Sequence, residues 1–305
     1  MIKHHRTICC GLFGFLALFC WIAPAQAQPS LQAQMAQIAA ATQGPVGAAV
    51  VVVEGGHIVA LHGEQRFPMQ SVYKIAIGMA VLHQVDLGTL KLDQQVRITK
   101  AELPLPPHYS PLRDRYPNGA TLPVSRLLDE MITVSDNTAS DHLLTLAGGP
   151  QQVTAFLRGL GLRDIVVATS EATMARNEQV EQYRNWATPT AMLGLLCALQ
   201  EGRGLSVDSR RRLLDRMTRC QTGPHQIKGL LPAGTAVAHK TGSSGTVDGL
   251  TRATNDAGLI TLPDGRHLAV VVFVSDTRAG MAVQEAVIAQ IARAAWESRV
   301  ELEHD

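Results

Sequence analysis

The sequence predicts an α+β fold: a five-stranded antiparallel sheet with the terminal helices packed on it, and an all-helical lobe inserted between its strands. Two β-branched runs lie near the start of the chain and three more lie near its end. The long segment between these two groups has helical periodicity. Because both groups must complete one sheet, we expect the first strands to pair with the last ones, with a functional cleft between sheet and helices.

The elements before residue 90 begin with a helix expected over residues 31–41. Two β-branched runs follow, GAAVVVVEGG (47–56) and HIVALHG (57–63). The Glu54-Gly55-Gly56 turn between them predicts a hairpin. Apolar residues at helical spacing then predict a helix over residues 72–87 that ends at Gly88.

The middle of the chain is predicted to be helical. A Pro-rich stretch, LPLPPHYSPLRDRYPNG (103–119), is expected to form a long irregular loop, where function is more common than core packing. Helical periodicity covers residues 123–159, with breaks at 135–137 and 148–149. Thr188 and Pro189 form an N-cap and first-turn pair for a helix that reaches about residue 201, and another helical pattern covers 205–220.

The last part of the chain contains three predicted strands, 235–242, 256–262 and 267–275, and a final helix over 281–298. The predicted division is therefore an α/β lobe formed by residues 28–66 and 221–305, and a helical lobe formed by residues 67–220.

Residues 1–27 have the pattern of a secretory signal peptide: a basic start, an apolar run over 8–22 and the cleavage pattern Ala25-Gln26-Ala27. Cleavage leaves 278 residues with a formal charge of −1, because it removes two of the 27 basic residues and none of the 26 acidic ones. This near-neutral balance argues against nucleic acid as a partner. No second apolar run approaches the roughly 20 residues of a membrane span, so we expect no stable membrane insertion after cleavage. A retained anchor is the alternative.

Two cysteines, Cys197 and Cys220, remain after cleavage. An oxidising compartment permits a disulfide between them but does not require one. The histidines have no HExxH or other zinc-ligand spacing, so we expect neither a metal nor an organic cofactor.

Three short motifs carry reactive side chains. Ser71 and Lys74 stand three residues apart where a helix is expected to start, so they share a face, and the helix N-terminus favours negative charge near Ser71. A partly buried lysine beside other cations can act as a base. The alternative is that Ser71 is only a helix cap. The other motifs, each weak alone, are Ser135-Asp136-Asn137 at a helix break and Lys240-Thr241-Gly242 at a strand end.

In this order, with about 60 and then about 100 residues between them, the motifs resemble the signature set of serine β-lactamases and penicillin-binding proteins. The surrounding stretches FPMQSVYK, VSDNTASDHLL and VAHKTGSSG resemble those of class A serine β-lactamases. The resemblance covers essentially the whole chain after the signal segment.

The resemblance implies a role for each motif residue. Ser71 would attack the β-lactam carbonyl, with the backbone N–H groups of Ser71 and Ser243 forming an oxyanion hole beside Gly242. Ser135 would pass a proton to the leaving nitrogen. Asn137 would hold the substrate side-chain amide and Lys74. Lys240 and Thr241 would receive the substrate carboxylate, and Tyr109 would line the cleft entrance.

A glutamate distinguishes a class A β-lactamase from a penicillin-binding protein. The penicillin-binding protein stalls as an acyl-enzyme, whereas the β-lactamase has a base that activates water to release it. In VATSEATMARNEQVEQYRNWATP (167–189), Glu171 resembles that base, with Glu178 and Glu181 as competitors. Whether Lys74 or Glu171 takes the proton during acylation stays open.

The same stretch departs from the common class A pattern. Ala175 stands where an asparagine usually helps to hold the water, and Thr169 and Asn185 stand where an arginine–aspartate pair is usual. Their joint absence avoids a lone buried charge. These departures resemble the PER-type extended-spectrum subgroup and imply a roomier site that admits oxyimino-cephalosporins. An additional arginine near the carboxylate pocket is expected at Arg278, with Arg252 as second candidate.

The resemblance implies a monomeric hydrolase that acts on small-molecule penicillins and cephalosporins and gives antibiotic resistance. With the signal peptide it implies secretion into the periplasm of a Gram-negative bacterium. The alternatives are a peptidoglycan D,D-peptidase or transpeptidase, a β-lactam sensor that acylates without turnover, and a catalytically inactive binding domain on the same fold.

Overall fold

The computed structural model describes residues 1–2 and 29–299. The expected signal segment therefore lies almost entirely outside the described residues. In the part of the chain that the structure describes, no helix combines the length and the apolar character needed to cross a membrane.

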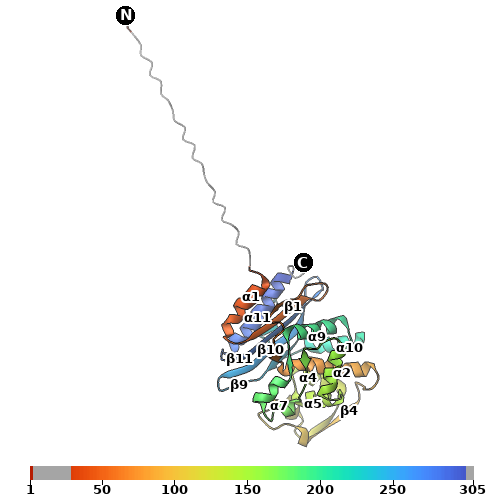
Figure 1. Cartoon of the computed structure of the whole chain (residues 1–305). Coiled ribbons are helices and arrows are strands. Elements are labelled where there is room, and N and C mark those ends of the chain that lie inside the picture. The colour runs from red at the N-terminus through yellow and green to blue at the C-terminus, as the bar shows by residue number, and fades with distance from the viewer. Residues whose placement is uncertain (3–28, 300–305) are drawn as a thin grey trace.

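The main sheet confirms the predicted fold class. Its strands lie in the order β2-β1-β11-β10-β8, all neighbours antiparallel, and the short strand β9 pairs with β10 (Figure 1). Val46 of β1 pairs with Val274 of β11, so the first strands close against the last ones as expected. The bounds are β1 Val46–Val52, β2 Val59–Leu61, β8 Val237–Ser243, β9 Thr246–Val247, β10 Leu250–Thr261 and β11 His267–Thr277.

Both faces of this sheet are buried, which explains why β1 is apolar throughout instead of alternating. Ala48, Val50 and Val52 face the two helices from the chain ends, α1 (Leu31–Ala39) and α11 (Met281–Glu297). Ala49 and Val51 face the other way, into the core shared with the helical part. Figure 1 shows α1 and α11 together on one side of the sheet and the remaining helices beyond it.

The helical part surrounds α2, whose residues 74–82 are all buried. Its apolar all-round character fits a central helix. The helices of this part are η2 Gln70–Tyr73, α2 Lys74–Asp86, η3 Lys100–Glu102, α3 Pro111–Arg115, α4 Val124–Thr133, α5 Asn137–Leu146, α6 Pro150–Gly159, α7 Glu171–Met174, α8 Glu178–Glu181, η4 Gln182–Arg184, α9 Pro189–Glu201 and α10 Val207–Thr218. The short helices η1 (Ala40–Thr42) and η5 (Ile227–Leu230) contact α11 instead.

The inserted part is not entirely helical. Strands β4 (Gln95–Thr99) and β5 (Gly119–Pro123) form a pair, and β3 (Phe67–Pro68), β7 (Trp186–Ala187) and β6 (Ile165–Val166) form a small sheet. Runs of two residues carry no periodic signal, so the sequence could not reveal the second sheet. That sheet matters for function, because it ties the segment before Ser71 to the end of the loop that carries Glu171.

Candidate active site

Ser71 lies in the 3₁₀ turn η2, directly before α2. No side-chain cap bond is formed at the start of η2 or α2, and among the described residues the Ser71 hydroxyl has no hydrogen-bond partner. The structure therefore does not support the reading of Ser71 as a helix cap. Ser71 as a whole is partly exposed.

Strand β8 lies very close to this turn. A Cβ atom on Gly242 would stand 2.5 Å from the Met69 carbonyl oxygen and 3.0 Å from the Ser71 nitrogen, so only glycine permits the approach. From the neighbouring strand, Asn255 Nδ2 donates to the Pro68 carbonyl at 2.7 Å. These contacts fix Ser71 against the edge of the sheet.

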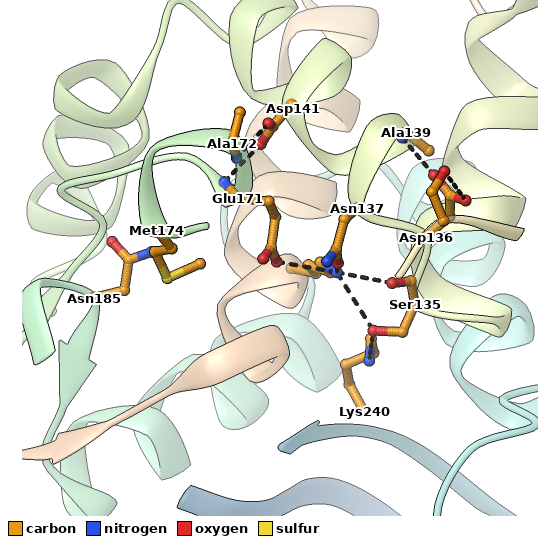
Figure 2. A network of polar contacts seen from close by, with 12 residues as sticks. Ser135, Asp136, Asn137, Ala139, Asp141, Glu171, Ala172, Met174, Asn185 and Lys240 are labelled. Atoms are coloured by element: carbon orange, nitrogen blue, oxygen red, sulfur yellow. Dashed lines mark hydrogen bonds and ion pairs between the residues drawn. The ribbon is translucent and has the colours of Figure 1, made fainter. Parts of the chain in front are cut away.

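Lys74 is fully buried and joins three segments. Its Nζ donates to Asn137 Oδ1 at 2.6 Å and to the Ser135 carbonyl at 2.9 Å, and lies 3.1 Å from Glu171 Oε1. Figure 2 shows Glu171, Asn137 and Ser135 converging, with Lys240 on the far side of the Ser135 hydroxyl. A buried ammonium needs such partners.

The Ser135 hydroxyl stands between two lysines. Its Oγ accepts from Lys240 Nζ at 2.9 Å and lies 3.4 Å from Lys74 Nζ. Ser135 has a φ of 61°, a left-handed backbone that is strained for a serine and places the side chain at this point. Burial lowers the pKa of Lys240 to about 8 against the raising effect of nearby carboxylates and of Cys220.

Asp136, the middle residue of this motif, was assigned no role from sequence. Its Oδ1 caps α5 by accepting from Ala139 N at 2.8 Å, and its Oδ2 accepts from Leu112 N at 2.7 Å and from the Ser110 hydroxyl at 3.0 Å. Asp136 thus ties the 103–119 loop to the start of α5. The N-cap preference of aspartate could have indicated the first of these bonds.

Glu171 begins the short helix α7, whose cap is the hydroxyl of Ser170. The two carboxylate oxygens of Asp141 accept from the backbone N–H groups of Glu171 and Ala172, each at 2.8 Å. Burial, reinforced by the charge of Glu171, raises the pKa of Asp141 to about 6. Asp141 belongs to none of the three motifs, but it lies one helical turn after Asn137 and so shares its face, which is the signal that could have indicated it.

Asn185 closes the loop that carries Glu171. Its Oδ1 accepts from Ala168 N at 2.8 Å and Thr169 N at 3.0 Å, and its Nδ2 donates to the Thr169 carbonyl at 3.0 Å. A neutral amide thus connects the two positions where the sequence lacks the usual ion pair. This is the physical reason that both charges can be absent together.

A cavity of about 620 Å³ opens beside Asn137 and Glu171. Its walls are the segment 101–105, His108, the outer face of α5 and α7, with Ala175 at its border. Tyr109 is 52% exposed and lies between His108, which lines the cavity, and Ser110, whose hydroxyl donates to Asp136 Oδ2.

The carboxylate-binding candidates lie on β8. Thr241 Oγ1 is 2.6 Å from the hydroxyl oxygen of Thr222. Ser244 N donates to the Ala253 carbonyl on β10, and since N–H groups alternate along a strand, the N–H of Ser243 points toward the free edge of β8. That edge faces η2, where Ser71 lies.

The arginine candidates Arg278 and Arg252 each have a hydrogen-bond partner of their own. Arg278 Nη1 donates to the Asp248 carbonyl in the turn before β10, at 2.9 Å. Arg252 Nη2 donates to Gln179 Oε1 at 3.5 Å. Among the described residues, no group of three or more His, Cys, Asp or Glu side chains is arranged to hold a metal ion.

The assembled site can carry out acyl transfer through a serine. It offers a free hydroxyl, a lysine and a carboxylate in contact beside it, a second hydroxyl between two lysines, and backbone N–H groups at a strand edge.

Comparison with known proteins agrees with this chemistry. A model of the beta-lactamase enzyme family matches residues 30–298. The chain is 40% identical over 270 residues to the extended-spectrum beta-lactamase PER-1 of Pseudomonas aeruginosa, covering 88% of this chain and 87% of that protein. It is also similar to the crystal structure of a beta-lactamase from Chitinophaga pinensis, with a TM-score of 0.86, 46% identity and coverage of 88% and 99%. The structure of TLA-1 extended-spectrum beta-lactamase gives a TM-score of 0.85 at 40% identity, covering 88% and 97%.

Proposed function

This chain belongs to the class A β-lactamases and hydrolyses β-lactams, and from that premise we propose that Ser71 is the nucleophile and Glu171 the base for deacylation. The observation that carries the proposal is the contact of Lys74 with Ser135, Asn137 and Glu171 next to the free Ser71 hydroxyl.

In acylation, Ser71 Oγ forms a bond to the β-lactam carbonyl carbon, and its proton passes to Lys74 or Glu171. The N–H groups of Ser71 and Ser243 stabilise the oxyanion of the tetrahedral intermediate. The carbonyl–nitrogen bond then breaks, and the nitrogen takes a proton from the Ser135 hydroxyl. Ser135 Oγ regains a proton from one of the two lysines that contact it, Lys74 or Lys240.

In deacylation, Glu171 accepts a proton from a water that attacks the ester carbonyl, the ester bond breaks, and Ser71 regains its proton. Asp141 and Asn185 support this step by fixing the start of α7 and the loop around it. Lys240 and Thr241 receive the substrate carboxylate as a cation and a hydroxyl donor, and Asn137 binds the side-chain amide.

Intact mass measured over time after adding excess benzylpenicillin tests the mechanism. We expect an adduct that appears and then disappears as the drug is consumed, a persistent adduct in Glu171→Gln, and no adduct in Ser71→Ala. A persistent adduct in the unmodified protein would instead support a penicillin-binding or sensor role.

The finer proposal is an extended spectrum that includes oxyimino-cephalosporins. The cavity of about 620 Å³ beside Glu171 and Asn137 supports it, because a bulky acyl side chain attached next to the reacting carbonyl needs room there. The relatives whose names contain "extended-spectrum" add weight to it.

An asparagine introduced at Ala175 tests the role of the cavity. Since Ala175 borders the cavity, we expect Ala175→Asn to lower kcat/KM for cefotaxime roughly tenfold while kcat/KM for benzylpenicillin changes less than about threefold. Ala172→Asn is the matched comparison, because it makes the same substitution at another residue that lines this cavity. Equal losses on both drugs would contradict the assignment of this cavity to the acyl side chain.

We also propose cleavage after Ala27, a monomer in the periplasm of a Gram-negative bacterium, and the lobe boundaries 28–66 with 221–305 and 67–220. The signal pattern and the position of the site between sheet and helices support these proposals. The mass of the exported protein tests the cleavage site, and its elution volume in gel filtration tests the monomeric state.

A further inference from the structure

A buried hydrogen bond joins the turn of the nucleophile to the loop that carries Glu171. Gln70 directly precedes Ser71, and its side-chain Nε2 donates to Gln182 Oε1 at 2.8 Å. Gln182 begins η4, near the end of that loop, and lies 112 residues away from Gln70 in the sequence. The exposed fractions of Gln70 and Gln182 are only 6% and 1%. Because neither amide has ready access to water, breaking this bond would leave a buried polar group without a partner.

The backbone of Gln70 is held in an unusual conformation. Its φ is 45°, in the left-handed region that residues other than glycine rarely adopt. Such a backbone persists only where the surrounding structure holds it in place. Strand β8 lies close to it, because a Cβ atom on Gly242 would stand 3.0 Å from the Gln70 Cβ. The side chain is fixed separately by its bond to Gln182. Gln70 therefore connects the strand beside Ser71 with the Glu171 loop.

The bond to Gln70 is the buried anchor of residues 178–184, the segment that forms α8 and η4. The other two side-chain hydrogen bonds from this segment to the rest of the described chain are exposed, and they join Tyr183 to Asp276 and Gln179 to Arg252. Water competes for exposed hydrogen bonds, whereas the low dielectric of the interior strengthens a buried one. The Gln70–Gln182 bond is therefore the side-chain contact that fixes this segment most firmly.

We propose that Gln70 and Gln182 are positioning residues for deacylation, because their hydrogen bond keeps Ser71 and Glu171 in one relative position. In this scheme neither amide touches the substrate or the attacking water. The link acts at the end of the Glu171 loop, as Asp141 acts at its start by accepting from the Glu171 N–H. This inference rests on the proposed roles of Ser71 and Glu171.

The two steps of the reaction depend on this link differently. Acylation keeps Lys74 as a proton acceptor even when Glu171 shifts, since Ser71 and Lys74 lie in the consecutive elements η2 and α2. Deacylation requires Glu171 to hold a water against the ester on Ser71, so it depends on the distance between two separate segments. A displacement of about 1 Å in such a site can cost about a hundredfold in rate. Loss of the link should therefore slow deacylation more than acylation.

The first experiment measures both steps in Gln182→Met, which keeps the length of the side chain but removes the acceptor. Intact mass after rapid mixing with benzylpenicillin gives the rate of adduct formation and, once the free drug is removed, the rate of adduct loss. We expect adduct loss to be about tenfold slower and adduct formation to change less than about threefold. The matched control is Gln179→Met, the same substitution at an exposed residue of the same loop, where both rates should equal those of the parent. Parent rates in Gln182→Met, or equal losses in both steps, would overturn the proposal.

Two further variants keep the test decisive if Gln182→Met folds poorly. Gln182→Glu keeps an oxygen that accepts from Gln70 Nε2, so adduct loss should stay within about threefold of the parent rate. The double variant Gln70→Met/Gln182→Met leaves no amide without a partner, so its urea midpoint should recover toward that of the parent while adduct loss stays slow. Recovery of both stability and adduct loss in the double variant would show that packing, and not the hydrogen bond, positions Glu171.

Urea unfolding separates failure of this inference from failure of the proposed function, because it needs no substrate. The Gln70→Met and Gln182→Met variants and their double variant form a cycle, and the hydrogen bond predicts that the two single losses of stability do not add. Additive losses in a protein that still turns over benzylpenicillin would overturn the link alone. A parent protein that formed no adduct would instead overturn the proposed function, while the cycle still reported the bond.

Discussion

Ser135 combines a chemical role with a conformational cost. Its hydroxyl contacts Lys240 and Lys74, and its backbone occupies the left-handed region that glycine adopts more easily. The side chain that the site needs is thus held by a backbone that destabilises the fold.

Two substitutions at this residue separate the effects. Ser135→Ala and Ser135→Gly both remove the hydroxyl, so both should lower kcat for benzylpenicillin, by roughly a hundredfold if Ser135 relays the leaving-group proton. Only glycine relieves the strain, so Ser135→Gly should be about 1 kcal/mol more stable than Ser135→Ala in urea unfolding. Equal stability of the two variants would show that the backbone is not strained.

Asp141 links pH to the stability of the Glu171 loop. Its pKa in the folded protein is raised to about 6, so the folded state binds the proton more tightly than the unfolded chain, where the ordinary value is about 3.8. Stability contributed by the protonated form is therefore lost as pH rises from about 4 through about 6.

The variant Asp141→Asn tests this linkage. It lacks the titration, so its unfolding free energy relative to the unmodified protein should rise between pH about 4 and pH about 7, by at most about 3 kcal/mol. It also loses one acceptor for the N–H groups of Glu171 and Ala172, so its acyl-enzyme should live longer. A pH-independent difference in urea unfolding would contradict the raised pKa.

At the scale of elements, the contact between β8 and η2 sets the distance from the substrate-binding strand to the nucleophile. Gly242→Ala would place a Cβ 2.5 Å from the Met69 carbonyl oxygen, so β8 must move away from Ser71. We expect a loss in kcat/KM of more than tenfold. Gly159→Ala in α6 is the control, because open space surrounds that position and activity should be unchanged. Similar kinetics in both variants would refute the tight contact.

Most of the main elements could be predicted, because long strands and helices have a periodicity that a sequence displays. The strand predicted over 256–262 nevertheless starts at Leu250, since its polar first half is held by pairing with β11 and not by apolar character. Strands β3, β6 and β7 are too short to carry a pattern.

The three signature motifs revealed the residues of the candidate site, but not their supports. His239 and Asp256 meet only because of the register between β8 and β10, in which Asp256 stands opposite Thr241. Register depends on pairing across the sheet, which no local pattern encodes. Asp141 was visible as a neighbour of Asn137 on the helix, but its two N–H partners come from a distant loop.

At the scale of the whole molecule, one core cluster runs from the sheet into the helical part. Phe273 and Val271 of β11 belong to the same cluster as Ile75 of α2 and Leu193 of α9. Such continuity favours one cooperative unfolding transition, although the sequence is divided between sheet and helices.

Two tryptophans report on the two regions separately. Trp186 lies in β7 beside the Glu171 loop, and Trp296 lies in α11 on the opposite face of the sheet. In the protein lacking residues 1–27, Trp186→Phe and Trp296→Phe each leave one reporter. We expect coincident fluorescence midpoints in urea, matching the loss of circular dichroism. An earlier midpoint for the Trp186 signal would show that the helical part unfolds alone.

The position of β8 at the end of the strand order has a consequence for handling the protein. Ser71 can reach this strand because no other described strand occupies its outer edge, and η2 and α10 pack against it instead. On heating, separation of these helices would uncover a seven-residue edge able to template pairing with a second chain. Heat inactivation should therefore be irreversible and faster at higher protein concentration: the opening that admits an antibiotic also starts aggregation.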